Sequence, residues 1–471
     1  MFHKLLSRRR GVALVTAALG MSVLSAGFSG VAGATTTASV IGGSGSNTIY
    51  QLDLGLSSLF DQAPGCNLAA SPQPLDFSCG TPYATGSTVN QPGEDGETAT
   101  LENPYNDVVF QYPALGSGNG MHQLQGNSGT GAGEPAISYG RSSATPGNSH
   151  GTSAQTYVQF AIDGVSWVHF PVGPNKAKEP TQKATNMTLT QLQQIYADTL
   201  SCTVKGKAYT MDWICLGAKS SAHIDCYMAQ NGSGTEGTWA QYVTNGSSTP
   251  ACLNDEASGT AASHNGLFEN EISSITSPGS AYYNNDVGNA IYLFSYGKFS
   301  VECALKGKSA ICPGAQGWTT AMGQINGISA TQSTIQGAGG ASHGNFPIIR
   351  YLSNVYNNST STGAPGTAAA PATQATLNFM SEYGFLCKPG TQSDIDPYTG
   401  LNYRYEIETT LIQNGFFPID TGYSAATQKA GSPFSEGSVP NAAQITDPNF
   451  QLVDPTYNQS NPSGYCLPIA G

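Results

Sequence analysis

The segment Gln-Asn-Gly-Ser-Gly-Thr-Glu-Gly-Thr-Trp-Ala-Gln-Tyr-Val occupies residues 230–243 of the chain. Residues 231–235 are small and polar, so their backbone N–H groups are accessible, and Ser233 and Thr235 add hydroxyl groups. Trp239, Tyr242 and Val243 then follow at helical spacing. The segment therefore predicts a glycine-rich loop that leads directly into the start of a helix.

The start of a helix has unpaired N–H groups and a partial positive charge. An oxyanion placed over such a start gains hydrogen bonds and a favourable field, so Ser233, Gly234 and Thr235 are candidate ligands of an anion. The alternative is an ordinary helix N-cap, because serine and threonine cap many helices. The sequence of this loop alone leaves both interpretations open.

Two further loops have the same character. Residues 42–48 are Gly-Gly-Ser-Gly-Ser-Asn-Thr after a short β-type run, and apolar residues at helical intervals follow from Ile49. Residues 140–143 are Gly-Arg-Ser-Ser after a predicted strand. The candidate ligands from these two loops are Ser46, Asn47, Thr48, Arg141, Ser142 and Ser143.

Strands and helices alternate along the chain. Strands are predicted at residues 108–112, 136–139, 157–170, 290–296 and 346–352, and helices at 188–196, 267–275 and 375–383. Residues 188–191, Thr-Leu-Thr-Gln, have the form of a capping box at the start of the first of these helices. Such alternation indicates an α/β fold with mostly parallel sheets, in which ligands bind beyond the carboxyl ends of the strands. The Gly/Ser loops are expected at that position.

Residues 1–34 resemble a secretory signal peptide. Lys4 and Arg8 to Arg10 precede a mostly apolar run, and Ala32-Gly33-Ala34 has the form of a cleavage site. No cysteine lies near that site, and no later apolar run is long enough to span a bilayer. We therefore expect a secreted or extracytoplasmic protein without a lipid anchor.

The composition is acidic and poor in charge. The chain has 18 basic and 30 acidic residues, a formal net charge of −12, and only 10% charged residues. We expect no nucleic-acid partner, because an acidic surface is a poor match for the phosphates of nucleic acid. The solubility of the protein is expected to depend mainly on neutral polar groups, and the chain is also rich in glycine, with 57 residues. This composition suits an extracellular protein.

All 10 cysteines follow the predicted signal peptide, which predicts a disulfide framework in an exported protein. Their spacing suggests five pairs, although sequence alone does not fix the connectivity: Cys66 with Cys79, Cys202 with Cys215, Cys226 with Cys252, Cys303 with Cys312, and Cys387 with Cys466. A zinc site is the alternative, but no Cys-x-x-Cys pair is present and the histidines are scattered. We expect no metal and no cofactor.

Taken in order, several short motifs resemble those of the substrate-binding proteins of phosphate ABC importers, which have a type 2 periplasmic-binding fold. The matching residues are 43–48, 128–133, 189–213, 232–235, 325–328 with 334–335, and 346–348. Each motif is weak alone, and their shared order makes the set more specific. The resemblance covers most of the chain after residue 34.

The resemblance implies two α/β lobes with a cleft between them. The lobes would be residues 35–159 with 347–471, and residues 160–346, since the two predicted crossing strands lie at those breaks. It further implies a monomer that is not an enzyme and that clamps inorganic phosphate or a related oxyanion for an ABC permease.

Two departures from the family pattern affect the predicted site. Ala229 stands where the family has an arginine that neutralises the anion, and Ser143 stands where it has an aspartate that accepts the anion's proton. Arg141 replaces a family alanine two residues before Ser143. We therefore expect Arg141 to supply the missing positive charge.

Two other functions remain open at this level. A degenerate member of the family could keep the fold for a surface or adhesion role and bind no anion. A secreted hydrolase could use an exposed serine, but the chain has no Gly-x-Ser-x-Gly elbow and no histidine beside the serine loops.

Overall fold

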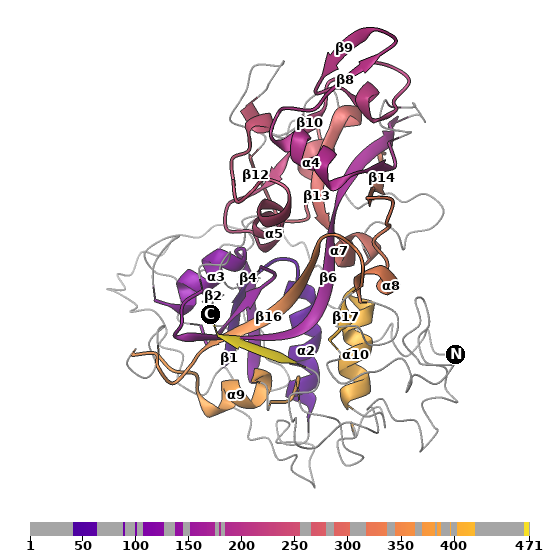
Figure 1. Cartoon of the computed structure of the whole chain (residues 1–471). Helices are drawn as coiled ribbons and strands as arrows, with labels where there is room; N and C mark the ends of the chain where they lie inside the picture. Colours follow the sequence, from indigo (N-terminus) through magenta and orange to yellow (C-terminus); the bar gives the residue numbers. More distant parts are fainter. Residues whose placement is uncertain are drawn as a thin grey trace, which may run out of the picture. The chain divides into compact units, whose positions relative to one another are not determined.

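The structure is a computed structural model with an α/β architecture (Figure 1). It describes residues 41–63, 88–89, 99–100, 107–126, 137–144, 151–174, 179, 184–254, 265–278, 287–301, 317–336, 344–362, 370–381, 384–387, 396, 403–419 and 466–470. The predicted signal peptide, the loop at 128–133 and most of residues 63–106 lie outside these ranges. No helix of the described part is long and apolar enough to cross a membrane.

Most strands belong to one ten-stranded sheet. Its path is β10 (Asp225–Cys226), β13 (Ala290–Ser295), β6 (Gln155–Val172), β16 (Ile349–Asn357), β5 (Tyr139–Ser142), β1 (Ile41–Gly45) and β4 (Val109–Ala114). Off this path, β14 (Thr319–Met322), β17 (Phe417–Pro418) and β18 (Leu467–Ala470) pair with β6. β1 pairs in parallel with β4 and β5, and β10 with β13, while the antiparallel pairs all involve β6 or β16.

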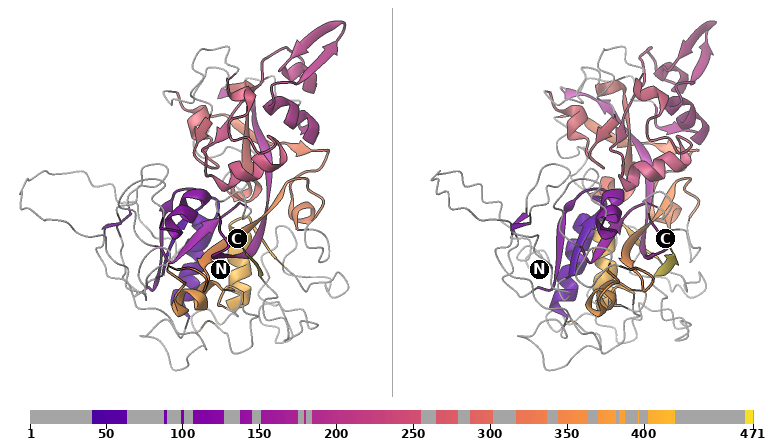
Figure 2. Two further views of the ribbon diagram at one scale, coloured as in Figure 1. Left: turned by 60° about the vertical axis from the view of Figure 1, so that its left-hand side comes forward. Right: turned by 90° about the vertical axis from the view of Figure 1, so that its left-hand side faces the viewer.

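Four smaller two-stranded sheets join β2 (Thr88–Val89) to β3 (Ala99–Thr100), β7 (Asn186–Met187) to β15 (Gln324–Ile325), β8 (Ser201–Val204) to β9 (Lys207–Thr210), and β11 (Met228–Ala229) to β12 (Asn265–Leu267). The helices are α2 (Tyr50–Gln62), α3 (Ser117–Leu124), α4 (Leu189–Tyr196), α5 (Gly234–Tyr242), α6 (Ser273–Thr276), α7 (Tyr296–Phe299), α8 (Gln332–Ile335), α9 (Gln374–Met380) and α10 (Tyr403–Gln413). Helices α2 and α10 run side by side, and the β8–β9 hairpin extends from the body of the protein (Figures 1 and 2). The α/β class expected from the sequence is confirmed.

Strand β6 is an inner strand that connects the two parts of the sheet. Its residues 155–164 pair with β16, and residues 165–169 pair with β13. In the first pairing Arg350 lies directly opposite Asp163, so one basic and one acidic side chain share a rung of the ladder. Cross-strand neighbours of opposite charge stabilise a sheet, and here the rung is buried.

The buried apolar residues form two large clusters. One contains residues between Ile162 and Ile348, together with Phe417 and Ile419. The other contains residues from Ile41 to Ala161 and from Leu352 to Cys466. The lobes expected at residues 35–159 with 347–471 and at residues 160–346 stay a prediction.

Local expectations succeed where the pattern is strong. The capping box predicted at residues 188–191 is present, because the Thr188 hydroxyl accepts from the Gln191 backbone and the Gln191 side chain accepts from Thr188 N–H. The helix predicted at residues 267–275 is wrong. The chain there forms β12, a turn with Asn270 at φ +59°, and the four-residue α6. A left-handed residue ends any regular helix, and asparagine tolerates that conformation.

Three predicted disulfides are present in the described residues: Cys202–Cys215, Cys226–Cys252 and Cys387–Cys466. The first closes the base of the β8–β9 hairpin, and the third ties residue 387 to the start of β18. The predicted pairs Cys66 with Cys79 and Cys303 with Cys312 lie outside the described residues.

We expect the protein to contain no free thiol, since the sequence predicts that the four remaining cysteines pair as well. Thiol titration under denaturing, non-reducing conditions measures this directly. Two or more reactive thiols per chain would contradict the prediction.

Candidate functional site

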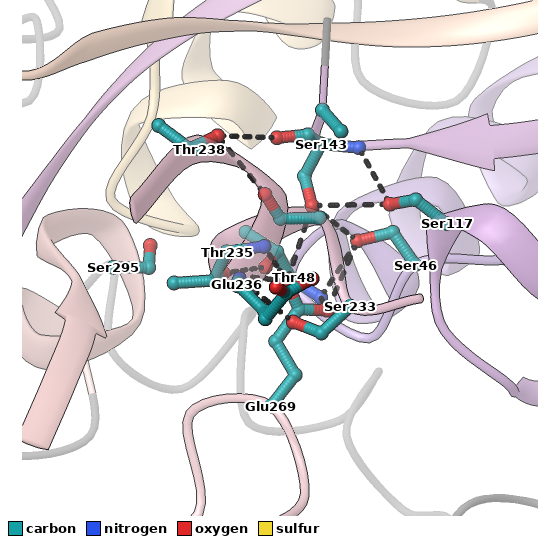
Figure 3. A network of polar contacts seen from close by, with 12 residues as sticks. Ser46, Thr48, Ser117, Ser143, Ser233, Thr235, Glu236, Thr238, Glu269 and Ser295 are labelled. Carbon is teal, nitrogen blue, oxygen red and sulfur yellow. Dashed lines mark hydrogen bonds between the residues drawn. The ribbon is translucent and has the colours of Figure 1, made fainter. Parts of the chain in front are cut away.

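A buried carboxylate lies where the three Gly/Ser loops meet. Glu269 follows β12, is only 1% exposed, and reaches toward the loops that carry Ser46, Ser143 and Thr235 (Figure 3). These loops follow β1, follow β5 and begin α5, respectively. The structure thus brings together residues from the three predicted loops, around a side chain that the sequence did not single out.

Hydrogen-bond donors surround both oxygens of this carboxylate. Oε1 accepts from Thr235 N at 2.7 Å, Thr235 Oγ1 at 2.5 Å and Ser143 Oγ at 3.2 Å. Oε2 accepts from Ser46 Oγ at 3.3 Å and from Thr48 N at 3.4 Å. Thr235 N belongs to the first turn of α5, and Thr48 N lies just before α2. The Thr235 N–H is a donor that a helix start leaves free for an anion, whereas the Thr48 N–H precedes the N-cap Ile49 and also donates to Ser46 Oγ at 3.2 Å.

Arg350 supplies the positive charge of the site. Its Nη1 lies 3.9 Å from Glu269 Oε1 and donates to Thr235 Oγ1 at 2.8 Å and to the Ser143 carbonyl at 3.1 Å. Its Nη2 donates to Thr48 Oγ1 at 3.3 Å. We call Ser46, Thr48, Ser143, Thr235 and Arg350 the anion cradle.

Asp163 holds the other side of the same guanidinium. Its Oδ2 accepts from Arg350 Nε at 3.0 Å and from Nη2 at 2.8 Å. The Asp163 carboxylate also accepts from Ser295 Oγ and Gly297 N. All of these groups are buried, so the pair fixes the direction in which Arg350 points.

Arg141 has different partners from those that its predicted role requires. Its guanidinium donates to the carbonyls of Gly43, Ser46 and Tyr112 and to Gln111 Oε1, at 2.6 to 3.4 Å. These contacts bind the loop after β1 to its neighbours. Arg141 therefore stabilises the loop that carries Ser46. Its binding of an anion stays a prediction that these contacts do not favour.

The remaining predicted ligands, Ser142, Ser233, Asn47 and Gly234, have four different roles in the structure. Ser142 points away, since its hydroxyl donates to the Ala144 carbonyl. Ser233 caps α5 by accepting from Glu236 N, so the ordinary capping role considered for this loop is also present. Asn47 Nδ2 donates to the Glu269 carbonyl. Gly234 is required for close approach, because a Cβ there would overlap the hydroxyl oxygens of Ser143 and Ser117.

The environment of Glu269 keeps it ionised. Burial disfavours its charged form, but Arg350 and hydrogen bonds from Thr235 and Thr48 outweigh that effect and hold its pKa below the ordinary glutamate value. Glu236, in the first turn of α5, behaves oppositely. Burial, with the negative charge of Glu269, raises the pKa of Glu236 to about 7. One of the two neighbouring carboxyl groups is thus a stable anion and the other is easily neutralised.

The sequence signals for the missed residues differ. Asp163 and Arg350 are charged residues inside otherwise apolar strands, which is a usable signal because a buried charge needs a partner. Glu269 gives no such signal, because its stretch reads as part of an amphipathic helix. In the described residues no group of three or more side chains could hold a metal ion, and no hydrogen bond of the cradle involves a histidine.

Removing one partner of the Arg350–Asp163 pair should be strongly destabilising, because the other partner is left as an uncompensated buried charge. Arg350→Met leaves Asp163 and Glu269 without their cation, and we expect it to lower the free energy of unfolding by roughly 3 to 5 kcal/mol. Arg350→Met combined with Asp163→Asn should cost less than the sum of the single changes, by about 1 to 3 kcal/mol. Urea denaturation of the four proteins measures this coupling. Additive single effects, within about 0.5 kcal/mol, would contradict it.

Buried acids should make the protein most stable at mildly acidic pH. Burial, only partly offset by Arg141, raises the pKa of Asp53 to about 7, and Glu236 has a similar value. Between about pH 4 and 7 the folded protein then binds more protons than the unfolded chain, so the free energy of unfolding falls as pH rises. This stability is present at the lower end of the window and is lost as pH rises through about 7.

Asp53→Asn and Glu236→Gln should each reduce this pH slope by up to about 1.4 kcal/mol per pH unit. Denaturant unfolding across a pH series measures the slope, with the exposed Asp198→Asn as the matched control. Equal slopes for the parent and both variants would show that these groups titrate normally.

A family model described as PBP superfamily domain matches residues 79–383. No curated protein matches the chain.

Among solved structures, the chain is similar to a putative phosphate ABC transporter substrate-binding protein with bound phosphate from Clostridium perfringens, with 13% identity over 80% of this chain and 98% of that one and a TM-score of 0.40. It is also similar to a phosphate binding protein from Stenotrophomonas maltophilia, with 13% identity over 86% and 98% and a TM-score of 0.37. It is similar as well to an ABC-type phosphate transport receptor from Vibrio cholerae, with 13% identity over 68% of this chain and 88% of that one and a TM-score of 0.35.

Proposed function

Because the chain belongs to the family described as PBP superfamily domain, we propose that it is an extracytoplasmic binding protein for a small tetrahedral oxyanion. The membership confirms the resemblance inferred from the motifs and the fold class inferred with it. Phosphate is the first choice of ligand, as in the proteins of known structure to which the chain is similar. In this proposal the protein is secreted, acts as a monomer and delivers the anion to an ABC permease.

The convergence of donors on one buried carboxylate is the observation that carries the proposal. Two backbone N–H groups and three hydroxyls donate to the oxygens of Glu269, and a guanidinium lies 3.9 Å away. A phosphate presents oxygens of the same kind, and each bond to a charged group is worth roughly 1.5 to 3 kcal/mol. The cradle therefore has the donors that an oxyanion needs.

Arg350 takes the charge-neutralising role in this proposal. The family arginine is missing at Ala229, and Arg141 is bonded to carbonyls of the loop. Arg350 faces the cradle from β16 and already contacts the hydroxyls of Thr235 and Thr48. A guanidinium with fixed direction suits a tetrahedral oxyanion better than a flexible cation does.

One observation favours a second candidate function. Glu269 fills the cradle, which fits a family member that keeps the fold for a surface role and binds no external anion. This second candidate predicts that no oxyanion binds even after the Glu269 side chain is removed.

Calorimetric titration with phosphate, arsenate and sulfate, and with nitrate as a planar control, tests the proposal. We expect Glu269→Ala to bind phosphate and arsenate, since the cradle is then vacant. Adding Ser143→Ala should weaken that binding by about 10-fold or more, because one hydrogen bond to the anion is lost.

Ser142→Ala in the same background is the matched control. Its hydroxyl bonds Ala144 rather than the cradle, so the affinity should not change. If neither the parent nor Glu269→Ala binds any of the oxyanions, the proposed function is wrong and the surface role gains support.

A further inference from the structure

Glu269 occupies the cradle in the manner of a ligand. Its two oxygens receive hydrogen bonds from segments far apart in the sequence, at residues 46–48, 143 and 235. Asp163 is also fully hydrogen-bonded, but Glu269 differs from it because its donors are the ones that the proposed function assigns to an external oxyanion. The occupant and the proposed ligand therefore compete for the same atoms.

The loop around Glu269 is built to hold the side chain there. Asn270 adopts φ +59°, its Oδ1 accepts from Ser295 N at 2.8 Å, and its Nδ2 donates to Thr48 Oγ1 at 3.0 Å. The carbonyl of Phe268 accepts from Tyr292 Oη at 2.9 Å. Both neighbours of Glu269 are thus fixed from other elements, and the carboxylate is directed into the cradle.

Charge balance leaves no room for a second anion beside Glu269. Arg350 is the cation of the cradle, and Asp163 already shares it at 2.8 Å. An oxyanion added to the occupied cradle would meet the charges of both Glu269 and Asp163, with Glu236 nearby. Like charges at this separation in a buried site repel strongly. An external anion must therefore replace the carboxylate of Glu269.

We propose that Glu269 is an internal ligand of the anion cradle, and that an external oxyanion binds only by displacing its carboxylate. This inference rests on the proposed function and adds the residue that sets the affinity and selectivity of the site. Since the resident group is a planar carboxylate, the vacated cradle also accepts small carboxylates such as acetate. The parent protein binds oxyanions weakly, because every ligand must outcompete a tethered group.

The test compares phosphate affinity in the parent, Glu269→Ala and Glu269→Gln by calorimetric titration. We expect Glu269→Ala to bind phosphate on the order of 10- to 100-fold more tightly than the parent. In the parent, phosphate must first break the hydrogen bonds between the cradle and the Glu269 carboxylate, whereas in Glu269→Ala these donors are free. Glu269→Gln keeps the volume without the charge and should fall between the two.

Glu271→Ala is the matched control. Glu271 lies two residues away in the same loop, carries the same charge, and accepts from Ser273 N outside the cradle. Its removal should leave phosphate affinity unchanged. Acetate should compete with phosphate in Glu269→Ala and have no effect on the parent.

The outcomes are distinct. If the parent and Glu269→Ala bind phosphate equally, or if acetate does not affect phosphate binding by Glu269→Ala, the internal-ligand inference is overturned while the proposed function stands. If neither protein binds phosphate, arsenate or sulfate, the proposed function fails, and this inference fails with it. Circular dichroism and thermal unfolding of each variant verify that the fold is retained.

Discussion

The ion pair between Arg350 and Asp163 is the interaction on which the site depends. The two residues face each other on neighbouring strands of the sheet, and both are buried. A buried pair contributes little net stability compared with apolar residues, but it is costly to break and it fixes geometry. Here it directs the remaining Arg350 donors toward Thr48, Ser143 and Thr235, so the register of β6 against β16 sets the position of the cradle's charge.

The second constraint is close backbone approach. Gly45 has φ +124°, and a Cβ there would overlap the Arg141 carbonyl. Gly234 lets the start of α5 contact Ser143. Hydroxyl and amide donors can converge on one carboxylate only because these two loops carry no side chain at the points of contact. The glycine-rich composition is therefore a requirement of the site rather than a sign of flexibility.

Much of the fold could be predicted from the sequence, because it is encoded by local patterns. Apolar spacing identified α2, the capping box identified α4, and cysteine spacing identified three pairs that the structure contains. The Gly/Ser loops were identified by composition, and the structure brings Ser46, Ser143 and Thr235 together. What could not be predicted is the direction of side chains. Arg141 lies in the expected loop but bonds backbone carbonyls, and Glu269 enters the site from a turn that periodicity assigned to a helix.

Strand β6 has a consequence for how the protein folds. One uninterrupted strand of 18 residues supplies Val158 and Phe160 to one apolar cluster and Val165 and Trp167 to the other. If β6 separated from its neighbours at one cluster, its backbone N–H and C=O groups there would lose their hydrogen bonds. The register of the strand at the other cluster would then be less well fixed. The two clusters should therefore behave as one cooperative unit. The same continuity means that a change of twist in β6 at one cluster is transmitted along the backbone to the other.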